Sequence, residues 1–182
     1  VKYKNPKTGE IFYLSYNTTE GEGVTTAQRP DNILSLSKEK SDTQYKFIFD
    51  AKYRINPAPV GSNYASKYQG IPGPKEDTIN TMHRYRDAII SQTDGDFTRT
   101  MVGAYVLFPY SNQEKFRKHK FYKSIEKVNV GAFPFLPGST ELVAEFLDNI
   151  IGESAFSNYQ RNLLPRGTDD FRPQREFKEN VL

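Results

Sequence analysis

The sequence has no cysteine and no tryptophan, and it holds only two histidines and two methionines. The missing thiols exclude a disulfide framework, a thiolate zinc site and a cysteine nucleophile. No apolar run reaches the about 18 residues that a membrane-spanning helix needs, and the start Val1-Lys2-Tyr3-Lys4 does not have the pattern of a signal peptide. We therefore expect a cytoplasmic protein that does not enter a membrane.

An excess of charge of one sign is also missing, because 25 basic residues are balanced by 22 acidic ones, leaving a net charge of +3. This balance does not by itself indicate nucleic-acid binding. Apolar residues make up only 36% of the chain, yet 13 Phe and 12 Tyr suffice for an aromatic core. The length suits one domain. We expect this domain to cover residues 1–165 and residues 166–182 to form a polar tail. The chain begins with Val inside a predicted strand, so we expect a C-terminal fragment of a longer protein.

Short aromatic and β-branched runs alternate with turn sequences in the first part of the chain, a pattern typical of strands, and apolar stripes later indicate helices. The expected fold is α/β, with a mixed central sheet flanked by helices. The expected elements are a hairpin over 1–17, strands 32–37 and 44–55, a loop over 56–75, a helix over 77–92 capped by Asp77, strands 101–108 and 128–136, and a helix over 140–151 capped by Ser139.

Asp50 and Lys52 are charged residues in an otherwise apolar predicted strand, and their spacing places both on the same face. Unpaired charges there would cost several kcal/mol, so a metal ion or a salt bridge must compensate them. Asp31 begins the neighbouring predicted strand. If the connector is centred on Ser41, Asp31 lies opposite Ala51 and on the other face. A slip of one residue or a bulge would bring Asp31 onto the face of Asp50.

Two carboxylates, Asp31 and Asp50, together with the Ala51 carbonyl, form a set of hard oxygen ligands suited to Mg²⁺ or Mn²⁺. Lys52 beside them is placed to orient a water molecule and to stabilise charge on a phosphate. This arrangement indicates a metal-dependent phosphodiesterase. The alternative is a buried ion pair of Asp50 with Lys52 beside a turn-forming Pro30-Asp31, and the spacing alone leaves both interpretations open.

Pro30-Asp31, 18 intervening residues and Asp50-Ala51-Lys52 on an apolar strand resemble the signature of the PD-(D/E)XK nuclease superfamily. The resemblance implies a restriction-endonuclease-like nuclease domain over about residues 1–165. More specifically, the sequence resembles the McrC-like branch of restriction-endonuclease-like proteins, with similar segments in the same order at 49–54, 77–89, 103–109 and 130–138.

The resemblance implies that Asp31 and Asp50 are metal ligands, that Lys52 is the catalytic lysine, and that the protein is a Mg²⁺-dependent DNA endonuclease of a restriction or defence system. It also implies a separate nucleotide-hydrolysing motor subunit as a partner. Related nucleases carry a Gln-x-x-x-Tyr pattern on the following helix, where this sequence has Thr81 and Tyr85. Many also use a Glu from a helix before the first strand. An inactive nucleic-acid-binding or scaffold domain is therefore the alternative function, and an RNA phosphodiesterase is a third.

Three further features bear on substrate binding. Arg54 follows Lys52 on the same face and is suited to a phosphate. His83 and Tyr85 lie on the predicted helix, where His83 either contacts the substrate or lies on the helix surface. The densest basic stretch, residues 115–127, either follows a nucleic-acid backbone or is a solvated connection whose aromatic residues dock on the core. We expect His119 within this stretch to be exposed.

Overall fold

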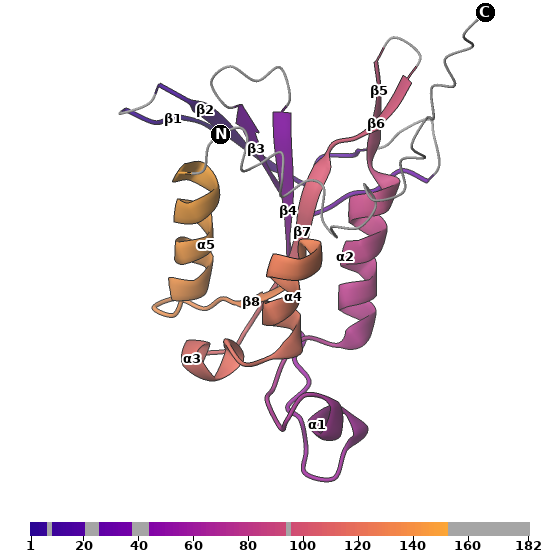
Figure 1. The fold of residues 1–182 in the computed structure, drawn as a ribbon, viewed down its shortest axis with the longest axis vertical. Helices are drawn as coiled ribbons and strands as arrows, with labels where there is room; N and C mark the ends of the chain where they lie inside the picture. Colours follow the sequence, from indigo (N-terminus) through magenta and orange to yellow (C-terminus); the bar gives the residue numbers. More distant parts are fainter. Residues whose placement is uncertain (7–8, 21–25, 38–43, 94–95, 153–182) are drawn as a thin grey trace, which may run out of the picture.

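A six-stranded mixed sheet forms the centre of the computed structural model, which describes residues 1–6, 9–20, 26–37, 44–93 and 96–152 (Figure 1). The strand order is β1-β2-β3-β4-β7-β8, and β5 and β6 form a separate pair. The strands are β1 (Lys2–Lys4), β2 (Ile11–Tyr16), β3 (Asn32–Ser37), β4 (Gln44–Ala51), β5 (Ile90–Thr93), β6 (Asp96–Arg99), β7 (Met101–Phe108) and β8 (Val130–Pro134). The helices are α1 (Asn63–Lys67), α2 (Glu76–Ala88), α3 (Gln113–Phe116), α4 (Lys120–Val128) and α5 (Glu141–Gly152).

Strands β1 to β4 form an antiparallel meander. Strand β7 then pairs in parallel with β4, and β8 pairs in parallel with β7. The α/β class, both hairpins and the two later strands are confirmed. Strand β4 ends at Ala51 rather than at residue 55. The Lys52 N–H still donates to Leu107 O at 2.8 Å, but Pro109 has no N–H with which β7 could continue the ladder.

Two helices cover opposite sides of the central strands, with α5 on one side and α2 on the other (Figure 1). Phe146 of α5 packs its ring against Tyr105 at 4.8 Å and Phe133 at 5.1 Å between ring centroids. Met82 of α2 is fully buried. Strand β7 is buried on both faces, which explains its unbroken apolar sequence. Within the described ranges, no helix combines the length and the apolar character needed to cross a membrane.

The predicted helix over 77–92 is shorter than expected, and its end differs from the prediction. Helix α2 stops at Ala88, and the chain from Ile90 forms the β5–β6 hairpin. The sequence Asp94-Gly95 between these strands is typical of hairpin turns, a signal that the apolar stripe concealed. At the other end Asp77 is not the cap. Lys75 occupies the N-cap position, and Asp77 lies in the first turn, where its charge favours the helix dipole.

The predicted loop over 56–75 contains helix α1, whose N-cap Ser62 accepts a hydrogen bond from Ala65 N–H at 3.0 Å. The basic stretch 115–127 likewise forms α3 and α4 rather than a connecting segment. The prediction that His119 is exposed is wrong, because only 1% of it is accessible. Its Nδ1 accepts from Phe121 N–H at 3.1 Å, and its ring stacks on Tyr68 and Phe116. It therefore caps α4 from inside an aromatic cluster.

The burial of His119 makes the stability of the fold sensitive to acid. Burial lowers its pKa to about 4 from the ordinary 6.5, so the folded protein binds a proton less readily than the unfolded chain does. Stability is therefore full above about pH 6.5 and falls as the pH decreases toward 4, by about 3 kcal/mol in total. We expect urea unfolding of His119→Gln to show a clearly smaller loss between pH 7 and pH 4.5 than the wild type shows.

The matched control for this experiment is His83→Gln, because His83 is the second of the two histidines and is exposed. Its variant should keep most of the wild-type loss of stability on acidification. Equal pH dependence in His119→Gln and the wild type would contradict the role given to burial of His119.

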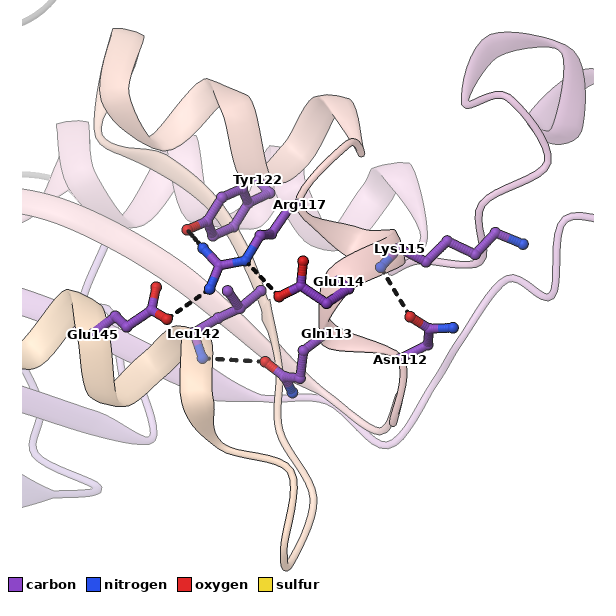
Figure 2. Close-up of polar contacts among 8 residues, drawn as sticks. All are labelled: Asn112, Gln113, Glu114, Lys115, Arg117, Tyr122, Leu142 and Glu145. Atoms are coloured by element: carbon purple, nitrogen blue, oxygen red, sulfur yellow. Dashed lines mark hydrogen bonds and ion pairs between the residues drawn. The ribbon is translucent and has the colours of Figure 1, made fainter.

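Side chains of α3 and of Arg117, the residue after it, contact α5, as Figure 2 shows. Arg117 Nη2 contacts Glu145 at 2.6 Å, and Arg117 Nε contacts Glu114 at 3.0 Å. The prediction that Ser139 caps α5 is not met. Ser139 Oγ donates to Ser111 O at 2.8 Å, and it is the buried Gln113 Oε1 that accepts from Leu142 N–H. A side chain from another helix thus supplies the missing hydrogen-bond acceptor.

Candidate functional site

The pairing of β3 with β4 differs by one residue from the alignment centred on Ser41. Asn32 pairs with Phe49, so Asp31 continues the ladder opposite Asp50 instead of opposite Ala51. Residues opposite each other in an antiparallel pair point to the same face. The shift of one residue that the sequence argument required is therefore present, and it brings both carboxylates to the same side of the sheet.

The backbone before β3 holds Asp31 at the end of the strand pair. Asn17 adopts a left-handed conformation with a φ of 56° and donates its N–H to Asp31 O at 2.7 Å. Asn tolerates this conformation better than most residues. Asn32 Nδ2 donates to Phe49 O at 3.3 Å, across the two strands. Asn32 lies on the opposite face of β3 from Asp31, and its hydrogen bond ties the start of β3 to β4.

Lys52 lies between the two carboxylates. Its Nζ is 2.5 Å from Asp50 Oδ2 and 3.9 Å from Asp31 Oδ2. The Ala51 N–H donates to Asp31 Oδ2 at 2.9 Å. The carboxyl end of β4 and the start of β3 thus place two anions and one cation together. The ion pair of Asp50 with Lys52 is therefore present, and Asp31 is a second carboxylate beside the same ammonium.

Burial makes Asp50 the unusual member of this group. Its side chain is 1% exposed, whereas that of Asp31 is 36% exposed and that of Lys52 28%. Burial raises the pKa of Asp50, the nearby Asp31 charge adds to the rise, and Lys52 opposes it. The folded protein therefore holds a carboxylate whose ionised form needs a neighbouring positive charge.

The donor set fits a hard divalent cation. Asp50 Oδ2 is buried, and its partner in the described part of the chain is the Lys52 ammonium. The N–H and C=O of a strand residue point to the same neighbouring strand, so the Ala51 carbonyl faces the side where Asp31 lies. Two carboxylates and a carbonyl are ligands that Mg²⁺ and Mn²⁺ accept together with waters.

No cluster of three or more Asp, Glu, His or Cys side chains with metal-binding geometry occurs in the described ranges. Two carboxylates are therefore the side-chain ligands that this part of the chain offers at the site. Mg²⁺ commonly binds through one or two carboxylates, with water or substrate oxygens completing its shell.

The remaining predicted site residues lie at different distances from this pair. Tyr85 is half-buried on α2, and its pKa is raised first by burial and then by the charge of Asp50. Arg84 lies over the Tyr85 ring, 5.8 Å from its centroid. Arg54 is exposed just beyond Lys52. The structure therefore brings Tyr85 close to the carboxylates and leaves Arg54 at the solvent side.

His83 is exposed on α2, and the structure does not bring it to the carboxylate pair. Burial of part of the ring lowers its pKa, and its charged neighbours are Arg86 and Asp87 on the same helix. Thr81, which stands at the Gln position of the related pattern, donates its hydroxyl to Asp77 O at 3.1 Å. Within the described contacts, His83 and Thr81 thus interact with their own helix.

Comparison with known proteins identifies the family of the chain. Residues 1–113 match a protein-family model described as the PD-(D/E)XK nuclease superfamily. The matched part includes β3, β4 and α2, and so it contains both aspartates, Lys52 and Tyr85. No curated protein and no solved structure matches the chain. The family match covers more than half of the 182 residues.

Proposed function

The chain belongs to the PD-(D/E)XK nuclease superfamily, and we propose that it is a metal-dependent endonuclease that hydrolyses phosphodiester bonds in DNA. The six-stranded mixed sheet with its helices is consistent with the restriction-endonuclease-like fold of this superfamily. The observation that carries the proposal is the convergence of Asp31 and Asp50 on the Lys52 ammonium. A structural ion pair with Lys52 needs only one carboxylate, whereas two carboxylates together with a carbonyl suit a divalent cation.

In this proposal Asp31, Asp50 and the Ala51 carbonyl hold Mg²⁺ or Mn²⁺. When bound, the ion supplies a Lewis acid for a phosphate oxygen and lowers the pKa of the attacking water. Lys52 orients that water and stabilises the negative charge that develops on the phosphate. Its flexible side chain, 28% exposed, can reach both carboxylates and solvent.

Tyr85, Arg54 and His83 are proposed to bind the substrate. The charges of Asp50 and Asp31 act on Tyr85, and its raised pKa keeps its hydroxyl protonated as a hydrogen-bond donor to a phosphate oxygen. The exposed Arg54 guanidinium is suited to two parallel hydrogen bonds with the next phosphate. His83 would contact DNA that passes over the exposed side of α2.

The biological setting follows from the similarity in segments 49–54, 77–89, 103–109 and 130–138 to the McrC-like branch. We propose that the chain is the nuclease part of a cytoplasmic restriction or defence system. Its partner would be a motor subunit that hydrolyses nucleotides, because the chain has no Gly-rich phosphate-binding loop of its own.

Removal of the metal ion tests the proposed chemistry. Circular plasmid DNA incubated with the protein and Mg²⁺ or Mn²⁺ is expected to be nicked or linearised, and EDTA should abolish the reaction because the carboxylates alone cannot polarise a phosphate. Gel electrophoresis of plasmid and of a matched RNA measures the outcome. Cleavage that persists in EDTA contradicts the metal site, and preferential cleavage of RNA contradicts the DNA assignment. Binding of DNA without any cleavage favours the inactive scaffold.

A further inference from the structure

Five lysines line one hollow on the surface, between α1 and α4. The hollow has a volume of about 330 Å³. No acidic side chain lines it, and Glu76 beyond its rim pairs with Lys67 at 3.1 Å. One fifth of the 25 basic residues of a nearly neutral chain is thus gathered at one place. The lysines are Lys67, Lys118, Lys120, Lys123 and Lys127.

The spacing of the lysines on α4 is unfavourable for the isolated protein. Lys120, Lys123 and Lys127 are three and four residues apart, which places them along one side of the helix, and all three are exposed. Like charges at this spacing repel each other. In the described part of the chain none of the three forms an ion pair within 4.0 Å. A bound polyanion would remove this repulsion.

Buried aromatic side chains fix the two walls of the hollow relative to each other. The Tyr68 ring lies 4.8 Å from the His119 ring and 4.8 Å from the Phe121 ring, between centroids. Tyr64 packs on Tyr68 at 4.4 Å and donates its hydroxyl to Pro74 O at 2.8 Å. The α1 wall therefore docks on the start of α4, and the lysines of both walls surround a preformed space.

We propose that this lysine hollow binds the sugar-phosphate backbone of a nucleic acid, as an anchor separate from the carboxylate pair. The nucleic-acid assignment rests on the proposed nuclease function. Ammonium groups bind phosphates as point charges, and phosphate contacts position a substrate without reading its sequence. The hollow therefore contributes affinity that is independent of base sequence.

The position of the hollow allows one substrate to reach both places. Glu76 at the start of α2 pairs with Lys67 of the hollow. Burial raises the pKa of Tyr85 on the same helix, and the carboxylates are close enough for their charge to add to this rise. Nine residues of α-helix span about 13 Å, which corresponds to about four base-pair steps of a duplex. From Lys120 to Lys127 the lysine stripe on α4 advances seven positions, or about 10 Å, which is the length of about three base-pair steps.

The salt dependence of DNA binding tests this inference. A fluorescent 20-base-pair duplex is titrated with the Asp50→Asn protein, which suppresses cleavage, over a series of KCl concentrations. Replacing Lys120, Lys123 and Lys127 together by Gln should reduce the slope of log K against log salt by about 2 to 3 and weaken binding about 10- to 100-fold at low salt. The charge-matched control replaces Lys2, Lys4 and Lys115, which are exposed elsewhere, and should change the slope by less than half as much.

Equal losses in the two triple variants would overturn the inference, because general charge would then explain the binding. An unchanged slope in the α4 variant would overturn it as well. These results are separate from the test of the proposed function. A wild-type protein that binds through the hollow but never cleaves in Mg²⁺ refutes the nuclease proposal alone. A protein that cleaves normally, with the slope unchanged in the α4 variant, refutes the hollow alone.

Discussion

Asp50→Asn is expected to lower the rate of DNA cleavage by about 10³-fold or more without unfolding the protein. The substitution removes one of two carboxylates that hold the cation, and a loss of about 4 kcal/mol of transition-state stabilisation corresponds to that factor. Asn keeps the shape of the side chain and an oxygen acceptor. The rate is measured with saturating protein on a labelled duplex in Mg²⁺.

The stability of Asp50→Asn should be equal to or higher than that of the wild type. Because burial raises the pKa of Asp50, ionisation is less favourable in the folded protein than in the unfolded chain. The ionised group therefore lowers stability as the pH rises above its unfolded pKa, and Asn removes this cost. Urea unfolding at pH 7.5 measures the difference. An inactive variant that is also strongly destabilised would contradict a role of Asp50 in cation binding and would favour a structural ion pair.

Lys52→Met is expected to lose activity by about 10²- to 10³-fold, the usual effect of removing a group that stabilises developing charge. In contrast to Asp50→Asn, it should also lose stability, by about 2 to 3 kcal/mol. The substitution removes the Lys52 ammonium, which lies 2.5 Å from Asp50 Oδ2, and leaves the charge of the 1% exposed Asp50 without a partner. The estimate stays below the range for a fully buried pair because Lys52 is 28% exposed.

A double variant separates the two roles of Lys52. Asp50→Asn combined with Lys52→Met should recover most of the lost stability and none of the activity, because the unpaired charge is then absent. Lys46→Met is the matched control. Lys46 lies on the same strand and pairs with the partly exposed Glu20 at 3.5 Å, so its loss should cost less than about 1 kcal/mol. A double variant as unstable as Lys52→Met would contradict the coupling.

Several strands of the central sheet were predictable because the signal for each is local. The strands at 32–37 and 101–108 were predicted with the observed bounds, the second from its continuous apolar run, whereas β5 and β6 were not predicted. The register between β3 and β4 was not predictable. It had to be counted from an assumed centre of the connector at Ser41, and the sequence does not mark that centre. An error of one residue placed Asp31 on the wrong face. The candidate site residues could thus be named from the sequence, while the convergence of Asp31, Asp50 and Lys52 needed the structure.

Long-range packing accounts for the other errors. His119 was expected on the surface because its neighbours in sequence are basic, yet it is buried by Tyr68, which lies 51 residues earlier in the chain. Nothing near His119 in the sequence indicates this contact. Helix α4 did carry a local signal, since Phe121, Ile125 and Val128 recur at helical spacing. The dense positive charge of the segment concealed it.

The hairpin of β3 and β4 also has a consequence for how the protein folds. Its two aspartates are 19 positions apart, so closing this loop costs less chain entropy than a contact between distant segments. Asp50 pairs with Val106 of β7, which lies 56 residues further along the chain, so complete burial of Asp50 requires this strand. Lys52 is only two residues from Asp50 and is therefore always near it. The positive charge that neutralises Asp50 is therefore supplied by the neighbouring sequence, and folding does not require a cation from a distant part of the chain.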